Sequence, residues 1–293
     1  MSDVILVTGA TGTLGSEVVR QLSNETSEVN IKAAIHTVDN ANKVQYPRVE
    51  TVQINYDNQE SLSKAFKGVN KLFLLTHPSA KTVEHESNLV NEAKKSGVTH
   101  IVKQSIMGAD LKAEVEAMRL HRQAEIIIEE SGIPFTFLRP NEFMQGFINF
   151  QSPSIKNNNA FYLPAGDAKV SIVDVRDIAS VAVKALSKNG FDKHKNKAYL
   201  ITGPEEISYY KAAEILSSVT NKKIDYINIS NEEAGGALKE MGMDEWLINT
   251  ILELYNYFKK GYASQVSSAV EEVTGKKPIS FTQFARDYSD AFR

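Results

Sequence analysis

Short apolar runs rich in β-branched residues alternate with helical patterns along the first two thirds of the chain. Between the runs, apolar residues recur three and four positions apart, and several of these segments end at glycine, as amphipathic helices do. The alternation predicts an α/β fold, a doubly wound parallel sheet of Rossmann type covered by helices on both faces. The predicted strands are 4–8, 30–36, 49–55, 70–76, 100–105 and 134–140.

The pattern changes after residue 152, where the chain becomes rich in Ser, Asn, Pro and Gly. Segment 170–204 then resumes the alternation, with a helix that begins near Asp174 or Asp177 and one further core strand at 197–203. From Ile207 onward the pattern is mostly helical, with one strand, KIDYINIS. We therefore expect a smaller, mostly helical C-terminal lobe. The expected division is 1–152 with 170–204 as the domain that contains the parallel sheet, and 153–169 with 205–293 as the smaller lobe.

Composition narrows the possible partners. The chain has 293 residues, 42% of them hydrophobic, and a net charge of -3 without a dense Lys or Arg block. This balance favours a small-molecule substrate over nucleic acid and is compatible with a monomer or a homodimer. There is no cysteine, and the six histidines show no metal-ligand spacing, so we expect no metal. The chain begins directly with a strand, without a leader or a membrane span, so we expect a cytoplasmic protein.

A glycine-rich turn follows the first predicted strand. In VTGATGTLG, Gly9, Gly12 and Gly15 recur at three-residue intervals before a predicted helix. Glycines in this context allow a tight turn, close approach of the backbone to a pyrophosphate and close packing of helix on strand. We expect a dinucleotide to bind here, also in contact with Thr11, Thr13 and Leu14.

The GxxGxxG spacing resembles that of extended and atypical short-chain dehydrogenase/reductases. Together with GIPFTFLRPNEFM, VSIVDVRDIA and YLITGPEEIS, it resembles the NmrA-like family of NAD(P)-binding proteins, and within it the triphenylmethane and quinone reductases. The resemblance spans nearly the whole chain. It implies that 1–152 with 170–204 is the NAD(P)-binding domain, and that 153–169 with 205–293 is the substrate-binding lobe. It implies that Asn55 and Tyr56 lie beside the adenine, and that Thr76, His77 and Pro78 lie beside the nicotinamide ribose.

The end of the second strand bears on the choice of dinucleotide. An NAD-selective site usually has a carboxylate there, but this chain has His36, followed by Lys43 in the same loop. The resemblance implies that His36 replaces an arginine that binds a 2′-phosphate, so we expect NADP(H) to be favoured over NAD(H). Asp39 is opposing evidence, since its carboxylate could reach the ribose, and His36 could also be a solvated loop residue.

The catalytic relay of the classical short-chain enzymes is absent. Ser105 occupies the serine position, but His121 and Glu125 stand where Tyr and Lys would lie one turn apart. Three roles stay open for His121: contact with the cofactor or substrate, proton donation by an unperturbed imidazole, or a structural pair with Glu125. The one Tyr-x-x-x-Lys match, Tyr255 to Lys259, lies far from Ser105 in sequence, and we interpret it as coincidence.

Apolar residues follow the sixth predicted strand, at the edge where doubly wound proteins bind ligands. Phe143, Met144 and Phe147 would suit a flat aromatic acceptor, and Met107 is a further candidate, although each could equally be core. Trp246 is a weaker candidate.

These observations favour an NADP-dependent oxidoreductase that transfers hydride to a small aromatic, quinone-like or dye-like acceptor. An extended electron-poor acceptor needs little acid catalysis, which would make the missing tyrosine dispensable. A non-catalytic NADP(H)-sensing regulator that acts through a protein partner is the alternative. A sugar epimerase or dehydratase is disfavoured because it usually requires the Tyr and Lys pair.

Overall fold

The computed structural model describes residues 3–25, 29–187 and 189–293, apart from the side chains at positions 25, 38 and 39. Within them the chain divides into two compact units. The first unit contains residues 1–111, 118–139 and 178–199, and the second contains 112–117, 140–177 and 200–293. The expected division placed 112–117, 140–152, 170–177 and 200–204 in the first unit, whereas the structure groups them with the second.

The first unit is built on a sheet that has seven strands among the described residues. The strand order is 3-2-1-4-5-6-9, and the pairs from β3 to β6 are parallel. All seven predicted core strands are present, each within two residues of its expected bounds. In spatial order they are β3 (Val49–Gln53), β2 (Val29–Ile35), β1 (Asp3–Val7), β4 (Lys71–Leu74), β5 (His100–Gln104), β6 (Phe135–Pro140) and β9 (Lys197–Ile201).

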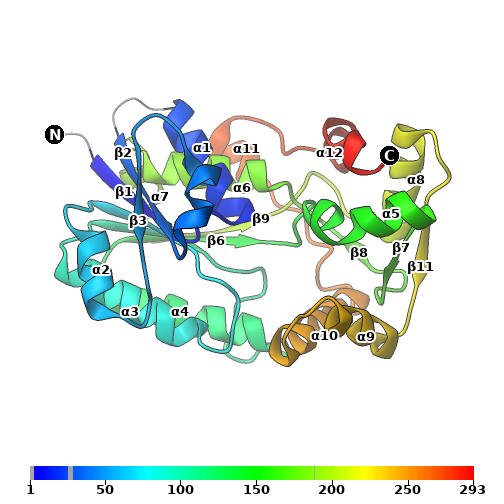
Figure 1. Cartoon of the computed structure of the whole chain (residues 1–293), viewed down its shortest axis with the longest axis horizontal. Helices are drawn as coiled ribbons and strands as arrows, with labels where there is room; N and C mark the ends of the chain where they lie inside the picture. Colours follow the sequence, from blue (N-terminus) through cyan, green and yellow to red (C-terminus); the bar gives the residue numbers. More distant parts are fainter. Residues whose placement is uncertain (1–2, 26–28, 188) are drawn as a thin grey trace. The chain divides into compact units, whose positions relative to one another are not determined.

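Helices cover both faces of this sheet. Figure 1 shows α1 and α6 on one face, and α2, α3 and α4 on the other. The helices are α1 (Thr13–Glu25), α2 (Gln59–Phe66), α3 (Thr82–Lys95), α4 (Glu116–Ser131), α6 (Val175–Leu186) and the short α7 (Phe191–His194), and a 3-10 helix, η1 (Val38–Val44), follows β2. The strand order and the two helical layers confirm the doubly wound prediction. Within this unit, one hydrophobic cluster fills the space between the sheet and the helices α2, α3 and α4. It includes Leu72, Leu89 and Phe137.

The second unit is mostly helical and contains two short two-stranded sheets. Its core is a cluster of aromatic side chains that includes Phe147, Phe161, Tyr209, Phe281 and Phe284. Its strands are β7 (Ala160–Leu163) parallel to β11 (Asp225–Asn228), and β8 (Lys169–Val170) antiparallel to β10 (Ile207–Ser208). Its helices are η2 (Phe147–Gln151), α5 (Ser152–Asn158), α8 (Tyr209–Thr220), α9 (Asn231–Glu240), α10 (Glu245–Lys259), α11 (Ala269–Thr274), α12 (Phe281–Asp287) and η3 (Ser289–Ala291).

In the described part of the chain, none of the helices combines the length and the apolar character needed to cross a bilayer.

Candidate functional site

The glycine turn joins β1 to α1 and leaves no room for a Cβ atom at Gly9 or Gly15. Gly9 has a φ of +61°, and a Cβ there would lie 2.9 Å from the carbonyl oxygen of Leu75. A Cβ on Gly15 would lie 2.1 Å from the carbonyl oxygen of Gly9. Both positions therefore require glycine, one for its backbone angle and both for close packing. Gly12 closes the turn by donating from its N–H to the Gly9 oxygen at 3.0 Å, and it is exposed.

This turn lies at the point where the strand order reverses, because β1 stands between β2 and β4. In doubly wound sheets, ligands bind at the carboxyl ends of the strands at this point. The contact of Gly9 with Leu75 brings the turn against the segment that follows β4. Of the other predicted turn residues, Thr11 is half-buried, Thr13 is exposed and Leu14 is buried. The side chain of Leu14 therefore belongs to the core, and its backbone N–H belongs to the first turn of α1, where N–H groups have no helical partner.

Three aromatic rings cluster at the carboxyl ends of β2 and β3. His36 is exposed and follows the last residue of β2, with its ring edge-on to Tyr56 at 4.8 Å between centroids. Tyr56 also packs against His85 at 5.5 Å, and burial raises the pKa of its phenol to about 12. Lys43 and Asn55 are exposed nearby in sequence, whereas the side chain of Asp39 lies outside the described part of the chain. A polar aromatic surface therefore lies at the carboxyl ends of β2 and β3, and the exposed Lys43 follows β2 in the chain.

The segment after β4 supplies one buried and two exposed residues. His77 and Pro78 are exposed, whereas Thr76 is buried and donates from Oγ1 to Glu86 Oε1 at 3.0 Å. Glu86 lies on α3, and its side chain is 2% exposed. The side chain of Thr76 is thus hydrogen-bonded to a buried carboxylate.

The same carboxylate holds a buried lysine. Lys103 Nζ lies 2.5 Å from Glu86 Oε2, and its side chain is 0% exposed. Lys103 Nζ also donates to the carbonyl oxygen of Gln104 at 3.2 Å and lies 3.3 Å from His121 Nδ1. The resulting group of Thr76, Glu86, Lys103 and His121, called here the carboxyl-edge cluster, connects α3, β5 and α4.

Neither Lys103 nor Glu86 was among the residues predicted for the site. A signal was present, because Lys103 follows the apolar pair Ile101 and Val102 within a predicted core strand, and a lysine is almost never fully buried without a partner. The sequence gives no indication of which carboxylate that partner is.

Ser105 and Glu125 form a second network. The hydroxyl of Ser105, which is fully buried, donates to Glu125 Oε1 at 2.7 Å. Arg139 donates to both oxygens of Glu125 at 2.9 and 2.6 Å, and Arg122 adds a contact of 3.0 Å. The side chain of Glu125 therefore binds a serine and two arginines, and the His121–Glu125 pair, one of the three roles left open for His121, is not among the contacts of the described residues. The network joins α4 to β5 and β6.

The protonation of His121 also differs from expectation. Burial, with the charge of Lys103 as a second cause, lowers the pKa of its imidazole well below the ordinary value. The expectation of an unperturbed imidazole is therefore wrong, because both causes disfavour the cationic ring. At neutral pH the His121 ring is uncharged.

Most of the predicted substrate residues lie in hydrophobic cores. Met144 and Phe147 belong to the core of the second unit, at 1% and 3% exposure, and Met107 in the first unit is 6% exposed. Phe143 is half-buried, with its backbone bridged to Val173. Met144 and Phe147 are therefore core residues, the alternative that the sequence left open. Phe143 is only partly buried.

The helix α10 has two buried polar atoms without a partner among the described residues. They are Nε1 of Trp246 and Oγ1 of Thr250, which lie one turn apart in the second unit. Further along the same helix, Tyr255 packs against the core and Lys259 is exposed. That distribution agrees with the interpretation of the Tyr-x-x-x-Lys match as a coincidence.

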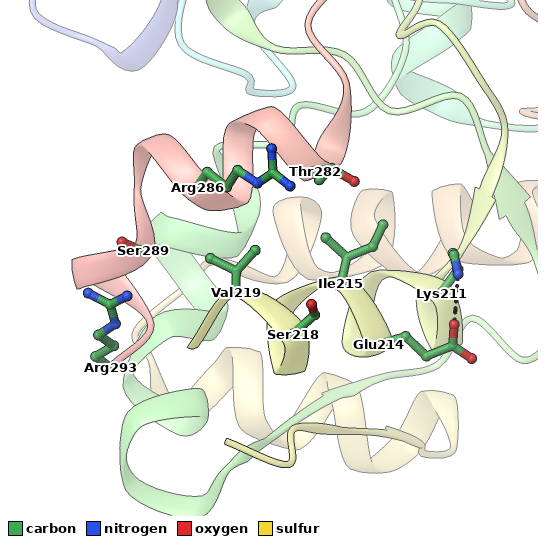
Figure 2. A pocket seen from close by; sticks show the side chains of 9 residues that line it. All are labelled: Lys211, Glu214, Ile215, Ser218, Val219, Thr282, Arg286, Ser289 and Arg293. Carbon is green, nitrogen blue, oxygen red and sulfur yellow. Dashed lines mark hydrogen bonds and ion pairs between the residues drawn. The ribbon is translucent and has the colours of Figure 1, made fainter. Parts of the chain in front are cut away.

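A surface hollow of about 660 Å³ lies between α8 and α12 of the second unit. Figure 2 shows Arg286 and Arg293 on one side of it, and Ile215 and Val219 on α8. None of the predicted site residues is among those that line this hollow.

The doubly wound sheet and the glycine turn at its switch point define a protein of the Rossmann dinucleotide-binding class. Residues 1–285 match the model of the NmrA-like family, and the chain belongs to this family. The resemblance inferred from the sequence motifs is thereby confirmed.

Similar proteins support the same class. The chain is 35% identical over 289 residues, 99% of each chain, to an NAD(P)H azoreductase of Xenophilus azovorans. It is 26% identical over 273 residues to quinone oxidoreductase 2 of Escherichia coli, covering 93% of this chain and 94% of the relative. The solved triphenylmethane reductase of Citrobacter sp., in complex with NADP(H), is 27% identical with a TM-score of 0.84, covering 98% of this chain and 99% of that one. The prediction of an oxidoreductase is confirmed by these relatives.

Proposed function

We propose that the protein is an NADPH-dependent reductase that transfers hydride to a small, conjugated, electron-poor acceptor of the azo, quinone or cationic-dye type. The observation that supports this most directly is the full-length similarity to an NAD(P)H azoreductase. Two features of the site support it further. The glycine turn fits a pyrophosphate, and the Tyr and Lys relay used on simple carbonyls is replaced by a neutral histidine.

The fit to a dinucleotide rests on the space that the turn leaves free. Gly12 is exposed and bears no side chain, so a phosphate can approach the backbone where α1 begins. His36 and Lys43, both exposed, provide cationic or hydrogen-bonding groups for a 2′-phosphate, and no carboxylate follows directly on β2. We therefore assign the preference to NADPH over NADH.

When bound, NADPH would supply a hydride from its nicotinamide ring. The residues of the chain then have modest tasks, because an extended acceptor delocalises the negative charge that arrives with the hydride. Thr76 and His121, held at the carboxyl edge by Glu86 and Lys103, orient the reactants. We assign Ser105 to positioning, since its hydroxyl is buried and committed to Glu125.

The direct test is NADPH consumption by the purified protein with an azo dye, a benzoquinone and a cationic triphenylmethane dye, followed by the absorbance of the reduced nicotinamide. Turnover of at least one acceptor is expected, faster with NADPH than with NADH. Tight NADPH binding without turnover of any acceptor would contradict the proposal and favour a cofactor sensor.

Two variants refine the test. His36→Asp should lower the ratio of kcat/KM for NADPH to that for NADH by about tenfold or more, because it places a carboxylate where the 2′-phosphate is expected. His121→Ala should slow turnover without abolishing it. If this variant lost all hydride transfer while NADPH still bound normally, His121 would be an essential acid and the orienting role would be wrong.

A further inference from the structure

The contacts of Lys103 fix where the protons of its neighbours lie. A lysine ammonium has three N–H groups and no lone pair. Lys103 has three neighbouring acceptors, namely Glu86 Oε2, the Gln104 carbonyl oxygen and His121 Nδ1. The Lys103 ammonium lies 2.5 Å from Oε2 of the Glu86 carboxylate. Each N–H group is then matched to one acceptor, and His121 Nδ1 must be unprotonated.

The other nitrogen of the ring is in a different position. His121 Nε2 has no hydrogen-bond partner among the described residues, and it does not belong to the buried polar atoms that lack one. Because a neutral imidazole bears one proton, a ring that accepts at Nδ1 bears it on Nε2. The open side of the ring is therefore a hydrogen-bond donor.

We propose that Lys103 is a positioning residue that locks His121 in the neutral Nε2–H tautomer, so that the imidazole presents an N–H donor to the ligand side of the carboxyl-edge cluster. Glu86 completes the lock by keeping Lys103 charged and oriented, while its second oxygen holds Thr76. This inference rests on the proposed reductase function only for what the donor contacts, a ribose hydroxyl or an acceptor oxygen or nitrogen. The tautomer itself is a property of the protein without a ligand.

The lock also limits the acid chemistry of His121. A neutral imidazole that gives up its Nε2 proton must gain one at Nδ1, or it would become an unstable anion. The group in contact with Nδ1 is Lys103, so any proton that leaves Nε2 must be matched by one that moves from Lys103 Nζ to Nδ1. That step would leave a neutral amine beside the Glu86 carboxylate. The resting cluster thus favours hydrogen bonding by His121 over proton release.

The test is nitrogen NMR of the full-length protein labelled with 15N-histidine, with His121→Gln used to assign the His121 signals. The expected result at neutral pH is one pyridine-type nitrogen, Nδ1, and one protonated pyrrole-type nitrogen, Nε2. A cationic ring at neutral pH, or the Nδ1–H tautomer, would overturn the proposal. This measurement needs no variant of Lys103 and no substrate.

Variants then assign the cause. Lys103→Met combined with Glu86→Gln removes the lock without leaving a buried carboxylate unpaired, and it should convert the single tautomer into a mixture. The matched control is Lys71→Met, which removes another buried lysine of the same sheet that contacts Asp3 and the Leu186 carbonyl. It should leave the His121 signals unchanged. An unchanged tautomer in the double variant would show that Lys103 does not set it.

Kinetics separate this inference from the proposed function. If the protein reduces acceptors, the double variant should lose about tenfold in kcat, as removal of a supporting group typically does, with a smaller change in KM for NADPH. Absence of turnover in the unmodified protein would refute the reductase proposal but leave the tautomer result intact. If the unmodified protein had the locked tautomer but the double variant kept full activity, the positioning role would be refuted.

Discussion

Two buried lysines of the first unit lie at opposite ends of neighbouring strands, and each has a histidine nearby. At the amino edge, Lys71 of β4 is in register with His100 of β5. At the carboxyl edge, Lys103 of β5 contacts His121 of α4. Both histidines have a lowered pKa, with burial as the larger cause and a lysine charge as the next.

The difference lies in what the second nitrogen of each ring can reach. His100 is fully buried and bonds through Nε2 to the Thr136 hydroxyl at 3.0 Å, while its buried Nδ1 has no partner among the residues that the structure describes. His121 is half-buried and leaves Nε2 available. The lysine–histidine pair at the amino edge is therefore enclosed. The pair at the carboxyl edge, where doubly wound folds bind their ligands, has an accessible histidine nitrogen.

The largest expected difference between the two edges concerns stability. Lys103→Met alone should lower the free energy of unfolding by about 3–5 kcal/mol, because it leaves the Glu86 carboxylate charged, buried and without its ion pair. Lys71→Met should lower it by only about 1 kcal/mol, because its partner Asp3 has a side chain that is 36% exposed and remains hydrated. Urea unfolding of the two variants at neutral pH measures both values. Equal losses would show that the two lysines are energetically alike.

The next effect is the pH dependence that His100 contributes. The pKa of His100 is lowered to about 4 by burial and by Lys71, whereas a histidine in the unfolded chain titrates near 6.5. Between these values the unfolded state binds more protons, so this stability is complete above about pH 6.5 and is lost as the pH falls toward 4. The loss amounts to about 3 kcal/mol.

Urea unfolding of the unmodified protein and of His100→Gln at neutral pH and at pH values down to 4 isolates this contribution. His121 acts in the same direction and is present in both proteins, so it cancels in the difference. The variant should show a shallower decline below pH 6.5 than the unmodified protein. Parallel curves would mean that His100 titrates normally in the folded protein.

Some features of the fold could be predicted from the sequence alone, and others could not. Periodicity and turn residues predicted the seven core strands, the longer helices and the glycine turn, because each depends on residues close together in the chain. The short elements η1, η2 and α11 were missed, because each has at most seven residues and is too short for a helical period to be recognised. The Glu86–Lys103 pair was missed for another reason, because it joins α3 to β5 and has no local pattern.

Where expectations about the site failed, a distant partner was responsible. Three roles were left open for His121, namely contact with the cofactor or substrate, proton donation by an unperturbed imidazole, and a pair with Glu125, four residues away. Neither the unperturbed ring nor the pair with Glu125 agrees with the contacts of the folded chain. Instead it contacts Lys103, which lies on a strand, and Glu125 is occupied by Arg139 from the following strand. Helical spacing places His121 and Glu125 on one side of α4, but the choice of partners is made by the sheet beneath the helix.

The smallest expected effect distinguishes a role in stability alone from a role in cofactor binding at the two edges. Thr136→Val removes the hydroxyl that bonds His100 and donates to the His194 carbonyl at 2.8 Å, and Thr76→Val removes the hydroxyl that donates to Glu86. Each variant should lose about 1–2 kcal/mol of stability, the usual cost of leaving a buried polar partner unsatisfied. Only Thr76→Val should also raise the dissociation constant for NADPH, measured by titration of the purified variants. If Thr136→Val weakened NADPH binding as much as Thr76→Val does, the amino edge would influence the cofactor site, and the distinction between an enclosed and an open edge would not hold.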